Sequence, residues 1–460
     1  MALKIALKKY LATYAEPESN GFTDFPYRFN QALVVPCHDE PVEAIFDLLQ
    51  LPETDDATLV ILVINQPDSP TTGSRDQQLW DTLQDQYTEK WVDQPGIVLY
   101  SLPDLNHSLL VVDRFSAGRQ IPHEQGVGLA RKIGSDIACK LIYNKKIASH
   151  WIHSTDADVR LPPDYFQPPT YHTDAAALIY PFQHHCQDKT LQLAIDLYEF
   201  RLRYYVAALQ WAGSGYGFHT IGSLICIDAN SYAKVRGFPK RAGAEDFYLL
   251  NKLAKVGTVQ SLESPVVQIE ARISKRVPFG TGPALESIQA LDLPLEDYRF
   301  YHPQNFIDLA CWHGLIKPLW HARKHYQQVG LYQTLESLLE TMTEQELRST
   351  EAEPSICGQL ERLHTILSGL KLDRFLDHGF SHCSNQSTFE KQLYDWFDGF
   401  KTLRFIHLSR DHYFPDIRLQ DITEQYTGWL EEISENSPEP GVNLAQAAYI
   451  KQGFSRQTDF

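Results

Sequence analysis

Two carboxylates one residue apart, Asp156 and Asp158, are the clearest chemical signal in the sequence. They follow the short apolar segment WIHST, which is typical of a buried strand. Mg²⁺ and Mn²⁺ are held by one or two protein carboxylates together with substrate phosphates, so this pair predicts a metal site. Such an ion would neutralise charge on a departing diphosphate. Acidic pairs also cap turns and helix starts, so a purely structural role stays open at this point.

A second carboxylate pair, Glu245 and Asp246, stands in the segment AGAEDFYLL. The small residues before it leave room for a ligand, and an aspartate there could remove a proton from a hydroxyl group. Acidic residues are also favoured in the first turn of a helix, which is the competing interpretation.

Several polar residues are candidates for holding a nucleotide. Asp39 and Glu40 follow one apolar segment, Asn65 follows another, and Gly126 and Arg131 open a helical segment. A glycine at a helix start lets a phosphate approach the backbone, and an arginine can neutralise it. Ordinary surface polarity would explain each of these residues equally well.

A basic, glycine-rich segment, ARISKRVPFGTG, carries Arg272 and Arg276. It could fold over a diphosphate, since arginine forks match phosphate oxygens. A solvated basic loop is the alternative interpretation.

The elements that must position these residues alternate between strand-like and helix-like segments over residues 31–285. This alternation predicts an α/β fold with a mainly parallel sheet and helices on both faces. Ligands of such sheets bind beyond the carboxyl ends of the strands, where the polar residues above stand. We therefore predict an N-terminal helical extension (1–30), a catalytic domain (31–285) and a helical C-terminal domain (286–460) with few strand signals.

Composition limits the classes of partner. The 460-residue chain has a net charge of −17, which argues against nucleic acid or an anionic membrane as a partner. Its seven cysteines form no close pairs, which favours a reducing compartment. The most apolar run, TLVILVI, is too short to span a bilayer, and no signal peptide is predicted. We predict a soluble cytoplasmic protein.

Taken in order, four segments resemble glycosyltransferases of the GT-A fold, in the large family-2-like group. The segments are VVPCHDE, GVGLARKIGSDIA, STDADVRLPPDYF and GSLICIDANSYAKVRGFPKRAGAEDFYLLNKLAKVG. The resemblance covers roughly residues 31–282, and the last segment matches most specifically. It implies a nucleotide-sugar donor, a hydroxyl acceptor, and Mg²⁺ or Mn²⁺ as cofactor.

The resemblance also implies roles for matching residues. Asp158 would bind the metal, and Asp156 would lie near the metal and the ribose. Asp246 would be the base of an inverting transfer, with Glu245 orienting the acceptor. The remaining implied contacts are with the nucleotide-sugar, at Pro36, Asp39, Glu40, Asn65, Gly126, Arg131, Arg272 and Arg276, and with the acceptor, at Gly222 and Ser223.

The sequence departs from the family pattern in two places that concern the donor. Asn65 stands where the second strand often supplies an aspartate to the base. Relatives often have a histidine metal ligand after the helix that follows the Glu-Asp pair, but the segment here reads VVQIEARIS, so Glu270 could substitute.

Our leading hypothesis is an inverting, metal-dependent sugar transfer. The alternatives are a retaining transfer to a small acid, a nucleotidyltransferase with a related fold, and a non-catalytic binding protein. The C-terminal helices could bind the acceptor, form a homo-oligomer or support the fold, and the sequence does not choose among these.

Overall fold

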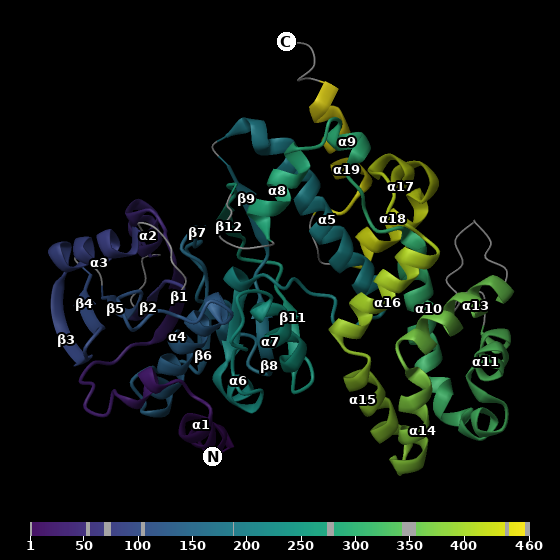
Figure 1. The fold of residues 1–460 in the computed structure, drawn as a ribbon, viewed down its shortest axis with the longest axis horizontal. Coiled ribbons are helices and arrows are strands. Elements are labelled where there is room, and N and C mark those ends of the chain that lie inside the picture. Colours follow the sequence, from purple (N-terminus) through teal and green to yellow (C-terminus); the bar gives the residue numbers. More distant parts are fainter. Residues whose placement is uncertain are drawn as a thin grey trace. The chain divides into compact units, whose positions relative to one another are not determined.

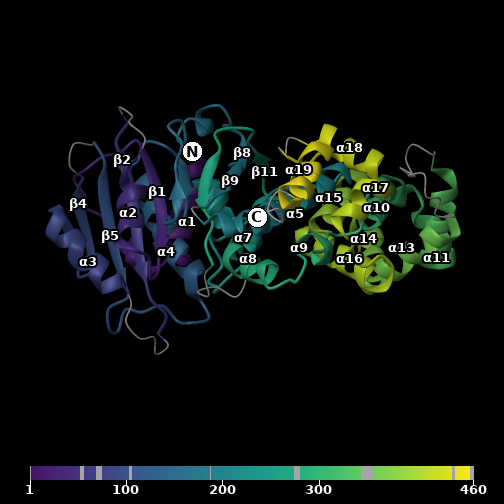
Figure 2. The same ribbon diagram turned by 90° about the horizontal axis from the view of Figure 1, so that it is seen from above.

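The computed structural model describes residues 2–51, 56–68, 75–102, 106–186, 188–273, 280–342, 356–437 and 441–455. The chain divides into two compact units (Figures 1 and 2). The first comprises residues 1–187 and 218–284, and the second comprises residues 188–217 and 285–460.

A nine-stranded sheet forms the core of the first unit. Its strand order is β11 (Thr258–Ser261), β8 (Ala175–Ile179), β10 (Ile225–Asp228), β6 (Trp151–Ser154), β1 (Gln31–Cys37), β2 (Thr58–Asn65), β5 (Ser108–Arg114), β4 (Ile97–Ser101) and β3 (Thr88–Gln94). β4 and β10 run antiparallel to both of their neighbours, so the other strands of this sheet share one direction. The predicted mainly parallel sheet is confirmed.

Strands β1 and β2 are buried at every position, which explains why their sequences are continuous apolar runs rather than alternating ones. They pair in parallel along their length, with Val34 opposite Ile61. This buried pair fixes the loop after β1 at the carboxyl edge of the sheet.

Helices cover both faces of the sheet. Helix α4 (Gly126–Tyr143) packs on β1, β2 and β6, whereas α2 (Val42–Leu49) packs with α3 (Arg75–Gln86). The chain passes from β1 through α2 to β2, and from β2 through α3 to β3, towards the β3 end of the sheet. It passes from β5 through α4 to β6 in the opposite direction. Right-handed crossovers therefore place α4 on the other face. The predicted α/β class is confirmed.

The N-terminal helix α1 (Ala2–Thr13) is part of this unit. It packs on α4 and on α6 (Ala229–Lys234), as Figure 1 shows. Its Tyr10 hydroxyl donates to the buried carboxylate of Asp136 at 2.5 Å, and Lys132 donates to the same carboxylate at 2.8 Å. Burial raises the pKa of Asp136, and the neighbouring Lys132 opposes that rise.

A second, three-stranded sheet, β7 (Val159–Arg160), β12 (Val267–Glu270) and β9 (Phe182–His185), completes the first unit together with α7 (Glu245–Leu253). Helix α8 (Thr281–Gln289) crosses the boundary between the two units along the chain.

The second unit is built from helices, as predicted for the C-terminal region. They are α5 (Gln192–Trp211), α9 (Pro294–Asp297), α10 (Pro303–His321), α11 (Arg323–Thr341), α13 (Ile356–Gly369), α14 (Leu372–His382), α15 (Gln386–Trp396), α16 (Gly399–His412), α17 (Leu419–Gln425), α18 (Thr427–Glu435) and α19 (Leu444–Ser455). We predicted α5 within the first domain, but it packs on α18 and α19, with Tyr204 edge-on to Trp429 at 5.6 Å. In the described parts of the chain, no helix is both long and apolar enough to cross a membrane.

Candidate active site

The candidate site lies at the carboxyl edge of the large sheet. Asp156 and Asp158 follow β6, and Glu40 follows β1. Strand β10 runs antiparallel to β6, with Ile225 opposite Ser154, so the residues just before β10 lie at the same edge. The reversed strand thereby brings the 3₁₀ turn Gly222–Leu224 beside the end of β6.

One buried arginine joins the two pairs. The side chain of Arg131, on α4, is 4% exposed. Its Nη2 donates to Asp156 Oδ1 at 2.6 Å, and its Nε donates to Glu245 Oε1 at 2.9 Å. Its Nη1 donates to Ser154 Oγ at 3.0 Å and to the Thr155 carbonyl at 3.2 Å. The motifs at residues 156 and 245 therefore share one counter-ion.

Electrostatics keep this arginine charged. Burial alone would lower the pKa of Arg131, but the charges of Asp156 and Glu245 raise it above its ordinary value. A buried charge is tolerated when it is paired and hydrogen-bonded, as it is here.

Asp246 differs from its neighbour. It is half-buried, and its Oδ1 accepts a hydrogen bond from the Phe247 amide at 2.7 Å. Burial, and then the negative charge of Glu245, raise the pKa of Asp246 to about 7. A carboxyl group that titrates near neutral pH can accept a proton from a substrate at physiological pH.

Two glycines in this region make room for the network. A Cβ at Gly222 would lie 2.4 Å from Arg131 Nη2. A Cβ at Gly126, where φ is +38°, would lie 2.6 Å from the Ala242 backbone. Gly126 was predicted to admit a phosphate. The structure shows that its bare Cα admits the loop that leads to Glu245.

A second arginine lies between two other carboxylates. Arg272, which follows β12, pairs through Nη2 with Glu40 Oε2, and the same nitrogen lies 3.5 Å from Asp158 Oδ2. Glu40 is 6% exposed. Burial alone would lower the pKa of Arg272, but the hydrogen bond and the charge of Glu40 raise it. Arg276, predicted to act with Arg272, lies outside the described residues.

The loop after β1 is held by a buried carboxylate that the sequence analysis missed. Asp76, at the start of α3, is 1% exposed and accepts from the Asp39 amide at 2.8 Å. Asp39 in turn accepts from the Arg75 amide at 3.1 Å and has a φ of +51°. An acidic residue in a first helical turn was the available signal for Asp76, but such residues are common.

The amide of Asn65 lies 6% exposed at the end of β2. With its nitrogen as donor, it bonds to the carbonyls of Cys37 (3.1 Å) and Val63 (3.3 Å). Pro36 lies within β1, opposite Val63. Asn65 therefore ties the ends of β1 and β2 together.

A divalent ion fits the oxygens at this edge. Among the residues that the structure describes, no three His, Cys, Asp or Glu side chains are arranged to hold a metal. An ion that keeps waters and substrate phosphates needs only one or two protein carboxylates. Asp156 and Asp158 supply such oxygens at 37% and 21% side-chain exposure, and the Arg272 guanidinium shows that a cation is accommodated against Asp158. Glu270, suggested above as a further ligand, is exposed. Its backbone amide donates to the Asp158 carbonyl at 2.9 Å.

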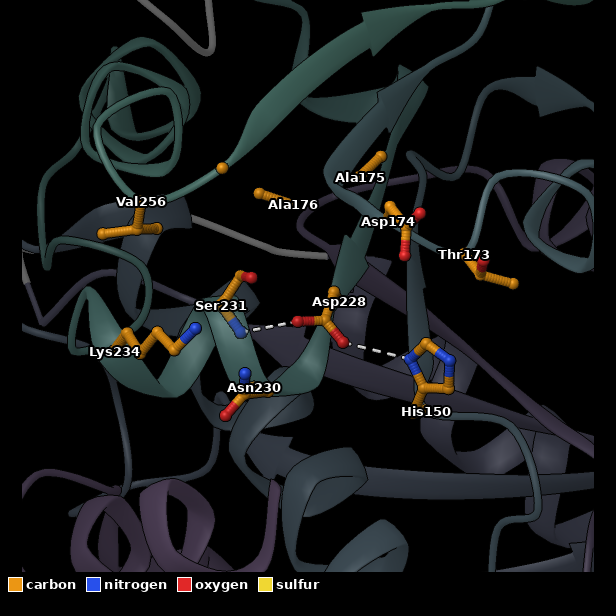
Figure 3. A pocket seen from close by; sticks show the side chains of 11 residues that line it. His150, Thr173, Asp174, Ala175, Ala176, Asp228, Asn230, Ser231, Lys234 and Val256 are labelled. Atoms are coloured by element: carbon orange, nitrogen blue, oxygen red, sulfur yellow. Dashed lines mark hydrogen bonds and ion pairs between the residues drawn. The ribbon is translucent and has the colours of Figure 1, made fainter. Parts of the chain in front are cut away.

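A hollow of about 400 Å³ lies at the opposite edge of the sheet, near His150, Asp228 and Lys234 (Figure 3). Three of its polar residues bond to one another. Asp228 accepts from the Ser231 amide at 2.7 Å, which caps α6, and contacts His150 Nδ1 at 3.0 Å. The hollow lies at the amino end of β6, away from Asp156 and Asp158, so we do not assign it to the site.

The predicted residues thus form two clusters. Arg131 brings together Asp156 and Glu245, and Arg272 brings together Glu40 and Asp158. Asp246 follows Glu245 in the chain, and Gly222, which precedes Ser223, lies against Arg131. Ser154 was missed, although a polar residue at the end of an apolar strand is a usable signal.

Comparisons with known proteins give weak likenesses. No protein-family model matches the sequence, and no curated protein matches it. The chain is structurally similar to residues 1–349 of S. aureus TarS in complex with UDP-GlcNAc, at 9% identity and a TM-score of 0.34, covering 80% of this chain and 89% of that one. It is also similar to the mannosyltransferase PcManGT from Pyrobaculum calidifontis in complex with GDP-Man and Mn²⁺, at 16% identity and a TM-score of 0.31, covering 86% and 94%. Likenesses of this size carry no argument about function, which rests on the chain's own residues.

Proposed function

We propose that the chain is a GT-A glycosyltransferase that moves a sugar from a nucleotide-diphosphate sugar to a hydroxyl acceptor. The observation that carries the proposal is the Arg131 bridge, because it joins the two carboxylate motifs at the sheet edge where α/β proteins bind ligands. A pair of capping carboxylates would not need a shared, buried counter-ion.

The donor side of the site comprises the Arg272 cluster, the loop after β1, the start of α4 and Asp156. Pro36, Asp39, Glu40 and Asn65 would contact the nucleotide, and Gly126 would contribute backbone at the start of α4. Asp158, with Asp156, would hold Mg²⁺ or Mn²⁺, which would stabilise the negative charge on the departing diphosphate. Arg272, with Arg276, would contact the diphosphate oxygens.

On the acceptor side, Gly222 and Ser223 would line the pocket and Asp246 would act as base. In the inverting reaction, the acceptor oxygen forms a bond to the anomeric carbon while the bond from that carbon to the diphosphate oxygen breaks. The hydroxyl proton passes to Asp246, and the electron pair of the broken bond leaves with the nucleoside diphosphate. Proton removal of this kind typically contributes about 10²–10⁴-fold to the rate.

Arg131 takes a positioning role in this proposal, in place of the phosphate contact that the sequence analysis assigned to it. Its donors already serve Asp156, Glu245, Ser154 and the Thr155 carbonyl. It therefore fixes the distance between the metal-binding and proton-accepting halves of the site.

The test is thermal stabilisation by a panel of UDP- and GDP-sugars, each with Mn²⁺, Mg²⁺ or EDTA. Wild type would be compared with Asp158→Ala and with a matched control, Asp164→Ala, whose aspartate is exposed in the following loop. We expect stabilisation by one nucleotide-sugar class that needs the metal and Asp158 but not Asp164. Stabilisation only by a nucleoside triphosphate would favour a nucleotidyltransferase instead.

Turnover is tested separately on the donor identified in this way. Asp246→Asn should keep donor binding and lose transfer. Unchanged turnover in that variant would remove Asp246 as the base and would favour a retaining reaction.

A further inference from the structure

The side chain of Arg272 lies against the carboxylate of Asp158, which is one of the two residues proposed to hold the metal. It contacts Glu40 from the end of β1 and lies 3.5 Å from Asp158 Oδ2, after β6. Glu40 is nearly fully buried and needs a nearby positive charge. Arg272 therefore supplies a cation to this corner of the site.

The guanidinium is only partly satisfied there. Its Nε is buried and has no hydrogen-bond acceptor among the described residues. Arginine can donate five N–H groups in a planar fork, which matches two phosphate oxygens better than two separate carboxylates. The side chain thus retains donor capacity for a further anionic group.

The backbone before Arg272 is fixed, so only its side chain needs to move. The Glu270 amide donates to the Asp158 carbonyl at 2.9 Å, and the Ala271 amide donates to the His185 carbonyl at 2.7 Å. The segment that leads into Arg272 is thereby tied to the residue that would hold the metal.

We infer that Arg272 is a placeholder cation, which keeps a divalent ion off Asp158 until a donor diphosphate draws the guanidinium away. This inference rests on the proposed function and adds to it the order in which the donor diphosphate and the metal ion bind. The Arg272 guanidinium and a divalent ion repel each other beside the same carboxylate, so the metal ion binds weakly when no donor is present. A diphosphate removes that repulsion by pairing with Arg272 and also supplies oxygens to the metal. Metal and donor then bind with positive coupling.

The experiment measures Mn²⁺ binding by the electron paramagnetic resonance signal of the free ion, which requires no turnover. Wild type, Arg272→Gln and Arg272→Lys would be titrated with Mn²⁺ alone. Arg28→Gln serves as the matched control, because Arg28 is exposed and the substitution changes net charge equally. We expect Arg272→Gln to bind Mn²⁺ alone at least about tenfold more tightly than wild type, with Arg272→Lys and Arg28→Gln close to wild type.

A second titration adds saturating UDP or GDP and corrects for Mn²⁺ bound by the free nucleotide. Nucleotide should tighten Mn²⁺ binding in wild type by a larger factor than in Arg272→Gln, because the variant has no placeholder to remove. Circular dichroism of each variant checks that it is folded.

The outcomes separate this inference from the proposed function. Equal affinity of wild type and Arg272→Gln for Mn²⁺ alone, with metal-dependent nucleotide binding in both, would overturn the placeholder role and leave the glycosyltransferase proposal standing. Absence of Mn²⁺ binding in every protein, with and without either nucleotide, would overturn both the placeholder role and metal dependence.

Discussion

Replacing Asp246 by asparagine should stabilise the protein at neutral pH while abolishing transfer. The pKa of Asp246 rises from 3.8 to about 7, first through burial and then through the charge of Glu245. At 1.36 kcal/mol per pKa unit, this difference sets an upper bound of about 4 kcal/mol of folding free energy, because the half-buried side chain keeps part of its hydration. Asparagine has a similar shape, its oxygen can keep the bond from the Phe247 amide, and it does not ionise.

The sign of the effect follows from the two pKa values. Below pH 3.8 the carboxyl group is protonated in both folded and unfolded chains, so it does not make stability depend on pH. Between pH 3.8 and about 7 the unfolded chain loses the proton and the folded chain keeps it, so rising pH destabilises wild type. Above about 7 the full penalty is present. The advantage of Asp246→Asn should therefore be small at pH 4.5 and greatest at pH 8.

The assay is thermal and urea unfolding of wild type and Asp246→Asn at pH 4.5, 6 and 8, with the exposed Asp24→Asn as control. A gain of up to about 4 kcal/mol would raise the melting temperature by up to about 10 °C at pH 8. Equal stability of the two proteins at pH 8, or a difference that does not change with pH, would refute the elevated pKa. The Asp24→Asn control should follow wild type throughout.

Three further outcomes follow from the same geometry. At donor concentrations well below saturation, where the rate reports the pKa of the donor-free enzyme, initial rates of transfer should rise with pH through about 7 when measured from pH 5.5 to 8.5. Gly128→Ala should destabilise the protein by about 1–3 kcal/mol, since its Cβ would lie 2.5 Å from the Pro239 carbonyl oxygen, whereas Gly215→Ala meets no atom within 4 Å and should be nearly neutral in urea unfolding. Arg131→Met should cost about 3–5 kcal/mol by the same measurement, because it leaves the buried Glu245 and the partly exposed Asp156 without their shared counter-ion.

Much of the first unit was predictable because its strands are buried on both faces. The runs QALVVPC and TLVILVIN leave little alternative to a central parallel pair. The direction of β10 was not predictable, because ICID reads the same whether the strand runs parallel or antiparallel. Helix α5 was assigned to the first domain by its place in the chain, yet its aromatic side chains pack on helices more than 200 residues later.

In the candidate site, sequence order identified the residues but not their partners. Asp156 and Glu245 were recognisable because each follows a strand or opens a helix at a family-like spacing. Arg131 was expected to meet a phosphate, because an arginine at a helix start usually has solvent in front of it. Only the packing of α4 against the loop before Glu245, through Gly126 and Gly128, shows that it faces two carboxylates instead.

Sharing one arginine couples the two halves of the candidate site. Because Arg131 bonds to Asp156 at 2.6 Å and to Glu245 at 2.9 Å, a shift of either carboxylate changes the field on the other. A metal ion bound to Asp156 would weaken the hydrogen bond between Asp156 and Arg131. It would thereby strengthen the pairing of Arg131 with Glu245. That change would reduce the negative field that Glu245 exerts on Asp246, which is one of the causes that raise the pKa of Asp246. Donor binding with its metal should therefore lower that pKa and increase the ionised fraction of Asp246 when a sugar is ready for transfer.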